Sequence, residues 1–321
     1  MAGDPLSDAR ALVAADLAEV ERLLAAALAT PVAPLEAVGG HLLGSGGKRF
    51  RALLTVLAGH AAGVPTSWAR RLAAAAELTH AASLCHDDVL DRGELRRGRA
   101  TVRVRFGDAL SILLGDVCLA QAFALLAEPE LAPASAALAR AVVAMAEGEV
   151  VQASRAGRVD LGAAEYLAVA EAKTGALLCW CATLGGLAPA ALRHALDDYG
   201  RALGRVYQIV DDILDLESGG LSGKLAGQDL RGGTTTLPVL LAAGASSEVR
   251  ERLRRLEYGA SDLEAAGALV EAVRASGALR QAQELACAEA DGAVAALATL
   301  PESPHRAALE KLARFAADRH A

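Results

Sequence analysis

Residues 207–215 read Tyr-Gln-Ile-Val-Asp-Asp-Ile-Leu-Asp, and residues 87–91 repeat the end of this pattern as Asp-Asp-Val-Leu-Asp. Each Asp-Asp-x-x-Asp motif closes an apolar run, and the two first aspartates are 124 positions apart. An apolar run with a period near 3.6 residues predicts an amphipathic or buried helix. The two motifs therefore predict a helical protein with two acidic helix ends.

The spacing within each motif brings its carboxylates together. Residues i and i+4 share one face of a helix, so Asp87 projects beside Asp91 and Asp211 beside Asp215. Like charges at this spacing repel, and the helix dipole opposes negative charge at a carboxyl end. Mg²⁺ would offset this cost, because it binds through one or two carboxylates together with substrate phosphates. The predicted metal ligands are Asp87, Asp88, Asp91, Asp211, Asp212 and Asp215.

A solvated acidic helix end would explain one such motif alone, but two copies after apolar runs favour a metal site. The pair Asp197-Asp198 serves as a comparison, because it lacks a third aspartate. We expect that pair to lie on the surface.

The composition predicts an all-α fold. Ala and Leu, both strong helix formers, dominate the chain, and aromatic residues make up only 3% of it. No segment alternates β-branched and polar residues, so we expect no strands. No repeat or long linker interrupts the pattern, so residues 1–321 should form a single domain. Periodicity and Gly or Pro punctuation predict helices over residues 8–29, 34–44, 49–62, 66–90, 107–127, 131–156, 163–185, 189–217, 234–242, 247–257, 261–275, 277–298 and 303–318.

Charge and cysteine content restrict the function classes. A formal net charge of −7 argues against non-specific binding of nucleic acid. Five cysteines within apolar runs predict reduced core thiols in a cytoplasmic protein. Residues 1–10 lack the pattern of a signal peptide. The most membrane-like stretch, residues 174–192, contains Gly and Pro, which favour a buried helix and a turn over a transmembrane span.

Cationic residues could bind an anion that shares the metals. Residues 46–51, Gly-Gly-Lys-Arg-Phe-Arg, place a glycine turn and three cations at the start of a helix, where backbone N–H groups also favour phosphate. Arg96 and Arg97 follow the first acidic motif in a loop from residue 92 to 101. Taken singly, each group also fits a surface turn or a neutralising charge. His80, two turns before Asp87, fits a hydrogen-bonded core residue as well as a ligand.

Taken together, these segments resemble the trans-type polyprenyl diphosphate synthase family over about residues 45–238. The matching segments are, in order, GGKRFR, HAASLCHDDVLDRGELRRGRATV, FGDALSILLGD, EGEVVQ, KTGALL, YQIVDDILD, GK and DLRGGTTTLP. The resemblance implies a helical bundle around a deep central cavity. It also implies a Mg²⁺-dependent prenyltransferase that joins isopentenyl diphosphate to an allylic diphosphate and releases pyrophosphate.

The resemblance implies a role for each matched position. The six aspartates match two Mg²⁺-binding motifs, and Lys173 is also expected to act in catalysis. The positions matched to the diphosphate of isopentenyl diphosphate are Lys48, Arg51, His80 and Arg97. Those matched to the allylic diphosphate are Arg96, Lys173, Thr174, Gln208 and Lys224. The family further implies a cytoplasmic homodimer without a transmembrane segment, whose membrane contact, for release of a lipid product, would be peripheral.

Two positions depart from the family pattern. Ala52 stands where the family often has Pro, and this change is expected to be neutral. Thr234 stands where the family often has a second lysine before Thr-Leu-Pro, and this change should alter affinity for the allylic diphosphate. The Gly-rich segment 218–236 is expected to form a lid that brings Lys224 to the phosphates.

Three other functions share parts of this pattern. A class I terpene cyclase uses the same ionisation, but it would carry a different second metal motif. A non-catalytic subunit of a two-component synthase would tend to lose aspartates, and none is lost here. A short-chain synthase would stop at farnesyl or geranylgeranyl diphosphate.

Small residues before the first motif predict the product length. The growing chain is expected to pass along the helix that carries Asp87, and the residues that would gauge it are Ala75, Ala76, Thr79, Ala82 and Ser83. None is an aromatic residue that would block the cavity. The twelve residues from Ala75 to Asp87 span about 18 Å at 1.5 Å per residue, which predicts a product of roughly 30 carbons or longer. Leu72 or Phe123 would form the floor.

Overall fold

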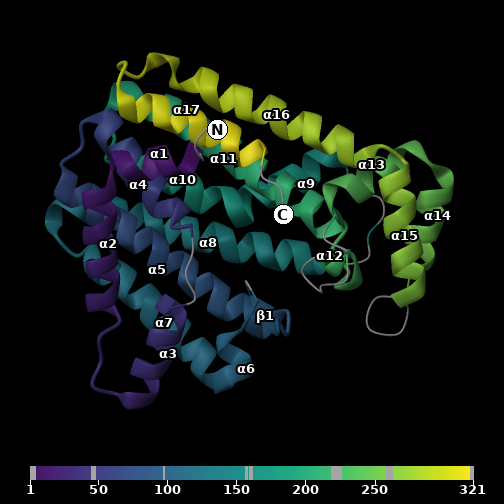
Figure 1. The fold of residues 1–321 in the computed structure, drawn as a ribbon, viewed down its shortest axis with the longest axis horizontal. Coiled ribbons are helices and arrows are strands. Elements are labelled where there is room, and N and C mark those ends of the chain that lie inside the picture. Colours follow the sequence, from purple (N-terminus) through teal and green to yellow (C-terminus); the bar gives the residue numbers. More distant parts are fainter. Residues whose placement is uncertain are drawn as a thin grey trace. The chain divides into compact units, whose positions relative to one another are not determined.

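The computed structural model describes residues 5–44, 48–96, 98–155, 158, 162–217, 226–256 and 263–318. Helices account for most of these residues (Figure 1), so the predicted all-α class is confirmed. The α-helices are α1 Pro5–Leu12, α2 Ala14–Ala27, α3 Ala33–Gly44, α4 Phe50–Ala62, α5 Thr66–Leu90, α6 Val102–Phe106, α7 Asp108–Leu125, α8 Ala132–Ser154, α9 Ala163–Ala170, α10 Ala176–Ala182, α11 Ala190–Glu217, α12 Gln228–Arg231, α13 Leu237–Ala245, α14 Ser247–Arg255, α15 Leu263–Ala275, α16 Ala278–Ala296 and α17 Pro304–Ala317.

Contacts between residues divide the chain into two compact units. The first contains residues 1–142, 179–197 and 297–309, and the second contains residues 143–178, 198–296 and 310–321. The first acidic motif lies in the first unit and the second motif in the second. A single domain over residues 1–321 remains a prediction.

In the first unit, α5 packs against α2, α4 and α7 (Figure 1). Small side chains permit this packing, because Ala73, Ala74 and Ala76 of α5 are fully buried. A Cβ atom on Gly59 of α4 would lie only 2.7 Å from the Cβ atom of Ala69. Close approach of helices thus builds this core with few aromatic residues, and it fixes the helix that ends in the first acidic motif.

In the second unit, α13 contacts α14, α15 and α16, and α14 lies beside α15 (Figure 1). Leu216 at the end of α11 and Leu230 of α12 are buried in the core that α13, α14 and α15 share. Gly227 precedes α12 with a φ of 74°, and a Cβ atom there would lie 2.6 Å from the Cγ2 atom of Val270. This turn brings the chain back beside the second acidic motif.

The loop after the first motif contains two short strands, although we expected none. Strands β1 (Leu95–Arg96) and β2 (Arg99–Ala100) form a two-residue antiparallel ladder. The expectation of no strands was therefore wrong here, because two residues are too few to produce a visible alternation. The helix α6, which follows this hairpin, was also missed.

The stretch predicted as one helix over residues 163–185 is interrupted. It contains α9, a π-helical turn at Glu171–Gly175, α10 and a 3₁₀ turn at Leu184–Gly186. Within the described residues, the helix that is long and apolar enough to cross a membrane is instead α7, by length and composition only. Residues 174–192 were therefore the wrong choice of most membrane-like segment.

Candidate active site

The first acidic motif lies at the carboxyl end of α5, and its three aspartates occupy different environments. Asp87 is half-buried and Asp91, which ends the helix, is exposed. Asp88 is buried and accepts hydrogen bonds from Arg96 Nη2 at 2.9 Å and Nε at 3.3 Å. Gly93 permits this arrangement, because a Cβ atom there would lie 3.0 Å from the Asp88 Oδ1 atom. Asp88 therefore anchors the hairpin, and Asp87 and Asp91 remain accessible.

The second acidic motif on α11 repeats this division. Asp211 is exposed, whereas Asp212 is only 1% exposed. The Asp212 carboxylate accepts hydrogen bonds from the Tyr166 hydroxyl, from Gln208 Nε2 at 2.8 Å and from the Leu237 backbone N–H at 3.0 Å. Burial nevertheless raises the pKa of Asp212 to about 7, although these donors favour the ionised form. Asp212 therefore ties α9, α11 and α13 together.

The third aspartate of the second motif fixes the turn before α12. Asp215 Oδ1 accepts the Gln228 N–H at 3.0 Å, and Oδ2 accepts the Asp229 N–H at 3.2 Å. These are orphan donors of the first turn of α12, which a carboxylate can satisfy. Helix α12 is thereby held beside the end of α11.

The π-helical turn presents Thr174 to α11 and Lys173 to α8. Gly204 of α11 permits close packing, because a Cβ atom there would lie 2.4 Å from the Gly175 Cα atom. The Thr174 hydroxyl donates to Gln208 Oε1 at 2.8 Å, so Thr174, Gln208 and Asp212 form one hydrogen-bonded chain. Lys173 pairs with Glu149 at 2.6 Å. Single-turn π-helices often mark functional sites, and here the turn joins three residues expected to bind the allylic diphosphate.

The cations at the start of α4 are not equivalent. Arg49 has a φ of 42° and is held by Glu21 at 2.6 Å and by Glu77 at 3.8 Å. The Nε atom of Arg51, by contrast, is buried without a hydrogen-bond partner. A buried donor without a partner is costly unless a ligand satisfies it. Arg51 therefore fits a role in anion binding, while Arg49 stabilises the helix start.

The remaining predicted positions fall into three groups. Lys48 is exposed, and His80 is half-buried on α5 in the same unit as Arg51. Arg97 and Lys224 lie outside the described residues, as do residues 218–225 of the expected lid. The proposed gauge residues all lie on α5; Ser83 is half-buried, and the buried ones are Ala75, Ala76, Thr79 and Ala82.

Two interpretations of single residues need correction. Asp197 is half-buried and accepts a hydrogen bond from Cys179 Sγ at 2.9 Å, so only Asp198 of that pair is exposed. Cys287 is exposed, so not every cysteine is a core thiol. Burial raises the pKa of Cys85 to about 12 and likewise that of Cys181. These two thiols stay protonated and are poor nucleophiles.

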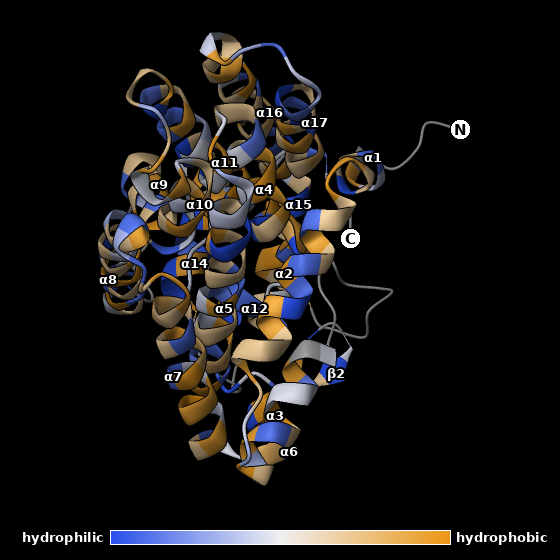
Figure 2. Cartoon of the chain, turned by 90° about the vertical axis from the view of Figure 1, so that its left-hand side faces the viewer, coloured by the Kyte–Doolittle hydropathy of each residue, from blue (hydrophilic) through white to orange (hydrophobic). Residues whose placement is uncertain are grey.

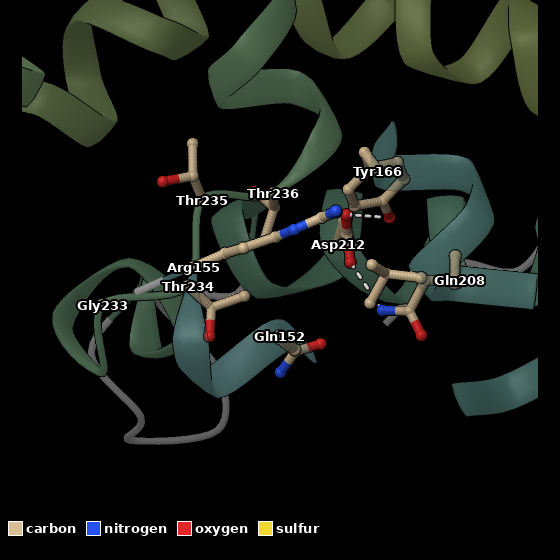
Figure 3. Close-up of a pocket in the computed structure, with 11 residues that line it drawn as sticks. Gln152, Arg155, Tyr166, Gln208, Asp212, Gly233, Thr234, Thr235 and Thr236 are labelled. Atoms are coloured by element: carbon tan, nitrogen blue, oxygen red, sulfur yellow. Dashed lines mark hydrogen bonds between the residues drawn. The ribbon is translucent and has the colours of Figure 1, made fainter. Parts of the chain in front are cut away.

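A pocket in the second unit is lined partly by residues that no sequence motif contains, among them Arg155 and Tyr166. It is partly open to solvent, and the space between its walls, open solvent included, is about 490 Å³. Figure 3 shows Tyr166, Gln208 and Asp212 joined by hydrogen bonds on one side, with Arg155 extending toward them. The Oγ1 atom of Thr236, which is 2% exposed, has no hydrogen-bond partner. The lining residues are Gln152, Arg155, Tyr166, Val169, Ala170, Gln208, Asp212, Gly233, Thr234, Thr235 and Thr236.

The sequence contained only weak signals for this pocket. Gln152 belongs to the quoted EGEVVQ segment, whereas Tyr166 and Arg155 are single residues outside any motif. Their grouping depends on the approach of segments more than forty residues apart.

The donor set of the two motifs fits a divalent cation. Among the described residues, no group of three or more Asp, Glu, His or Cys side chains is already arranged around a metal position. A site of one or two carboxylates that is completed by substrate phosphates is what Mg²⁺ prefers. Accessible Asp87, Asp91 and Asp211 provide such carboxylates.

Comparison with known proteins gives one consistent result. Residues 32–274 match the model of the polyprenyl synthetase family. The chain is 35% identical over 314 residues to octaprenyl diphosphate synthase of Escherichia coli, covering 96% of this chain and 97% of the relative. It is 36% identical over 327 residues to the all-trans-nonaprenyl-diphosphate synthase (geranyl-diphosphate specific) of Rhodobacter capsulatus, covering 99% of each. The crystal structure of a Caulobacter crescentus polyprenyl synthase complexed with calcium and isoprenyl diphosphate matches with a TM-score of 0.90, 39% identity and 98% coverage of both chains.

Proposed function

Because the chain belongs to the polyprenyl synthetase family, we propose that it is a trans long-chain polyprenyl diphosphate synthase. It joins isopentenyl diphosphate to an allylic diphosphate head to tail and releases pyrophosphate. The observation that carries this proposal is the shared design of the two acidic helix ends. In each motif the middle aspartate is buried and hydrogen-bonded, and at least one neighbouring aspartate is accessible.

The family works with a divalent metal ion, and we propose Mg²⁺ for this chain. Asp87 and Asp91 of the first unit would hold metal through their accessible carboxylates, and so would Asp211 of the second unit, with Asp215 on the same helix, α11. We give Asp88 and Asp212 a positioning role, because their oxygens already accept hydrogen bonds from Arg96 and Tyr166. When bound, the metal stabilises the negative charge that develops on the departing pyrophosphate.

The chain's own residues support the same reaction. The allylic C–O bond breaks, pyrophosphate leaves with the electron pair, the double bond of isopentenyl diphosphate attacks the cation, and a proton is lost. Lys173 and Thr174, on the π-helical turn, bind the allylic diphosphate together with Gln208. Arg51, whose buried Nε atom has no partner, binds isopentenyl diphosphate with Lys48 and His80. No covalent nucleophile is needed, which agrees with the raised pKa of the buried thiols.

The product is of the long-chain class. The relatives with full-length similarity include octaprenyl and nonaprenyl synthases. Long products of this kind agree with the small residues on α5. Ala75, Ala76, Thr79 and Ala82 are buried in the helix that leads to Asp87. We propose that they leave room for the growing chain, so that the product exceeds a farnesyl or geranylgeranyl unit.

We also propose that the active form is a homodimer covering α7. Ile112 is 42% exposed and Leu113 52% exposed on this helix, whose residues are mostly hydrophobic (Figure 2). Exposed apolar surface of this kind marks contact with a partner. Leu113→Glu should shift the protein from dimer to monomer in light scattering after gel filtration, and an unchanged dimer would contradict the assignment.

We further propose that the protein is cytoplasmic and contacts the membrane only peripherally. Cell fractionation tests this location.

The activity is tested by incubating the purified protein with labelled isopentenyl diphosphate, farnesyl diphosphate and Mg²⁺. Acid-labile prenyl product and pyrophosphate should appear together and should stop when EDTA removes the metal. Pyrophosphate release without transfer of the isopentenyl label would contradict a prenyltransferase.

A further inference from the structure

The pocket of Figure 3 is built where two segments meet beside Gln208 and Asp212 of α11. One segment follows α8 and contains Arg155, and the other contains Thr234, Thr235 and Thr236 before α13. The Thr235 hydroxyl donates to the Arg158 backbone carbonyl at 3.2 Å, which joins the two segments. The Leu237 N–H bond to Asp212 fixes the second segment to α11. The pocket is therefore held together by hydrogen bonds on two sides.

The charges in this pocket differ from those that the sequence pattern led us to expect. Thr234, which lines the pocket, stands where the family often has a lysine. Among the described residues that line it, the cationic side chain is Arg155, and it comes from a different segment of the chain. Figure 3 shows this side chain extending past Thr236 toward the end of the pocket formed by Tyr166 and Asp212.

We propose that Arg155 supplies the cation that Thr234 does not, and that it binds the diphosphate of the allylic substrate in this pocket. This inference rests on the proposed function and names a binding residue for it. A guanidinium group can bind two phosphate oxygens at once, whereas a lysine acts as a point charge. With threonine at position 234, the positive charge of the pocket comes from Arg155 on the segment after α8 instead.

A second observation indicates a ligand in the same pocket. Thr236 is 2% exposed, lines the pocket, and its hydroxyl has no hydrogen-bond partner. Buried hydroxyl groups are normally hydrogen-bonded. A diphosphate oxygen held by Arg155 would accept a hydrogen bond from this hydroxyl. Gln208, which lines the same pocket, already links it to Thr174 on the π-helical turn.

The interactions that Arg155 makes in the structure leave it available for a ligand. Its Nη2 atom lies 3.8 Å from Glu165 Oε1, and its Nη1 atom lies 3.4 Å from the Glu165 carbonyl oxygen. Glu165 is half-exposed, and its other carboxylate oxygen accepts the Gly162 N–H at 3.1 Å. A long ion pair near solvent contributes little stability. The several negative charges of a diphosphate would compete with this single carboxylate for the guanidinium group.

The test is a cycle of four proteins: wild type, Arg155→Gln, Thr234→Lys and the double variant. Binding of the unreactive thio-analogue of farnesyl diphosphate with Mg²⁺ is measured by calorimetry, and KM is measured separately for the allylic substrate and for isopentenyl diphosphate. Arg155→Gln should weaken analogue binding and raise the allylic KM by about tenfold or more, since it removes a charge-assisted contact. The KM for isopentenyl diphosphate should change by less than about twofold, because Arg155 serves only the allylic site.

Rescue distinguishes this role from a structural one. Thr234→Lys should restore most of the lost affinity in the Arg155→Gln protein, and it should gain less in the wild type, where the cation is already present. Arg155→Lys should keep part of the binding. Arg254→Gln is the matched control, because Arg254 is an exposed arginine of the same unit and lies outside the pocket lining. That variant should bind like the wild type.

Three results would overturn the assignment of Arg155. They are an unchanged allylic KM and analogue affinity in Arg155→Gln, equal losses for both substrates, and equal gains from Thr234→Lys in both backgrounds. An inactive wild-type enzyme would refute the proposed function instead. A wild type that makes polyprenyl products and keeps its allylic KM in Arg155→Gln would refute only the role of Arg155.

Discussion

Gly204 of α11 lies against Gly175 of the π-helical turn, and replacing Gly204 with alanine tests whether this contact positions the turn. The new Cβ atom would lie 2.4 Å from the Gly175 Cα atom and 3.2 Å from its backbone nitrogen. Favourable carbon–carbon contacts lie at about 3.5–4.0 Å. Both opposing atoms belong to the backbone, so no side chain can rotate away, and the π-helical turn must move.

The magnitude follows from two opposing effects. Alanine in a helix interior is favoured over glycine by about 1 kcal/mol, whereas overpacking of a tight contact costs about 1–3 kcal/mol. Gly292 of α16 provides the control, because it is also inside a helix and a Cβ atom there would meet nothing within 4 Å. Both variants gain the same helix propensity, so their difference, about 1–3 kcal/mol, measures the contact.

Urea unfolding of the metal-free proteins measures the difference in free energy of unfolding. Gly292→Ala should be slightly more stable than the wild type, and Gly204→Ala should be less stable than Gly292→Ala. Displacement of the turn also moves Thr174 away from Gln208, so Gly204→Ala should raise the KM for the allylic substrate. Equal stability of the two variants, with an unchanged allylic KM, would refute the positioning argument.

Three further predictions address the acidic motifs and the product. Asp87→Ala and Asp211→Ala should each lower kcat at least a hundredfold, roughly 3 kcal/mol of transition-state stabilisation. Asp198→Ala, the control, should leave kcat unchanged. Similar small losses of kcat in all three variants would contradict the metal assignment. The pKa of Asp212 is raised from 3.8 to about 7, so the folded state binds the extra proton in this window and the free energy of unfolding falls as pH rises through it. In metal-free protein Asp212→Asn should remove this fall, and an unaltered pH profile in urea unfolding would count against a buried, protonated carboxyl. Ala82→Phe should shorten the product, which chromatography of the dephosphorylated prenols measures. An unchanged product length would exclude Ala82 as a gauge of chain length.

The helices could be predicted well because the chain is rich in strong helix formers and its breaks are marked by Gly and Pro. The end of α5 at Leu90 and that of α11 at Glu217 agree with the predicted ends. The hairpin of β1 and β2 and the π-helical turn could not be predicted, because each spans six residues or fewer and depends on neighbouring segments. The choice between residues 174–192 and α7 as the most membrane-like segment failed because it gave more weight to the absence of charge than to unbroken helix length.

The candidate site, like the fold, could be predicted from the sequence only in part. The spacing of Asp87 and Asp91 indicates a shared helix face, but spacing cannot show that Asp88 and Asp212 are buried. That depends on Arg96 in the hairpin and on Tyr166 in α9, which approach only in the folded chain. The roles of Arg51 and Lys173 came from the resemblance.

The most direct test of the central claim is the length of the product made by the wild-type enzyme. Purified protein is incubated with labelled isopentenyl diphosphate, Mg²⁺ and, in turn, geranyl, farnesyl and geranylgeranyl diphosphate, and the prenols are separated after phosphatase treatment. We expect a long-chain polyprenyl product in the octaprenyl to nonaprenyl class from each accepted primer. A product that ends at farnesyl or geranylgeranyl diphosphate would contradict the long-chain assignment, and a cyclic hydrocarbon would contradict the synthase itself.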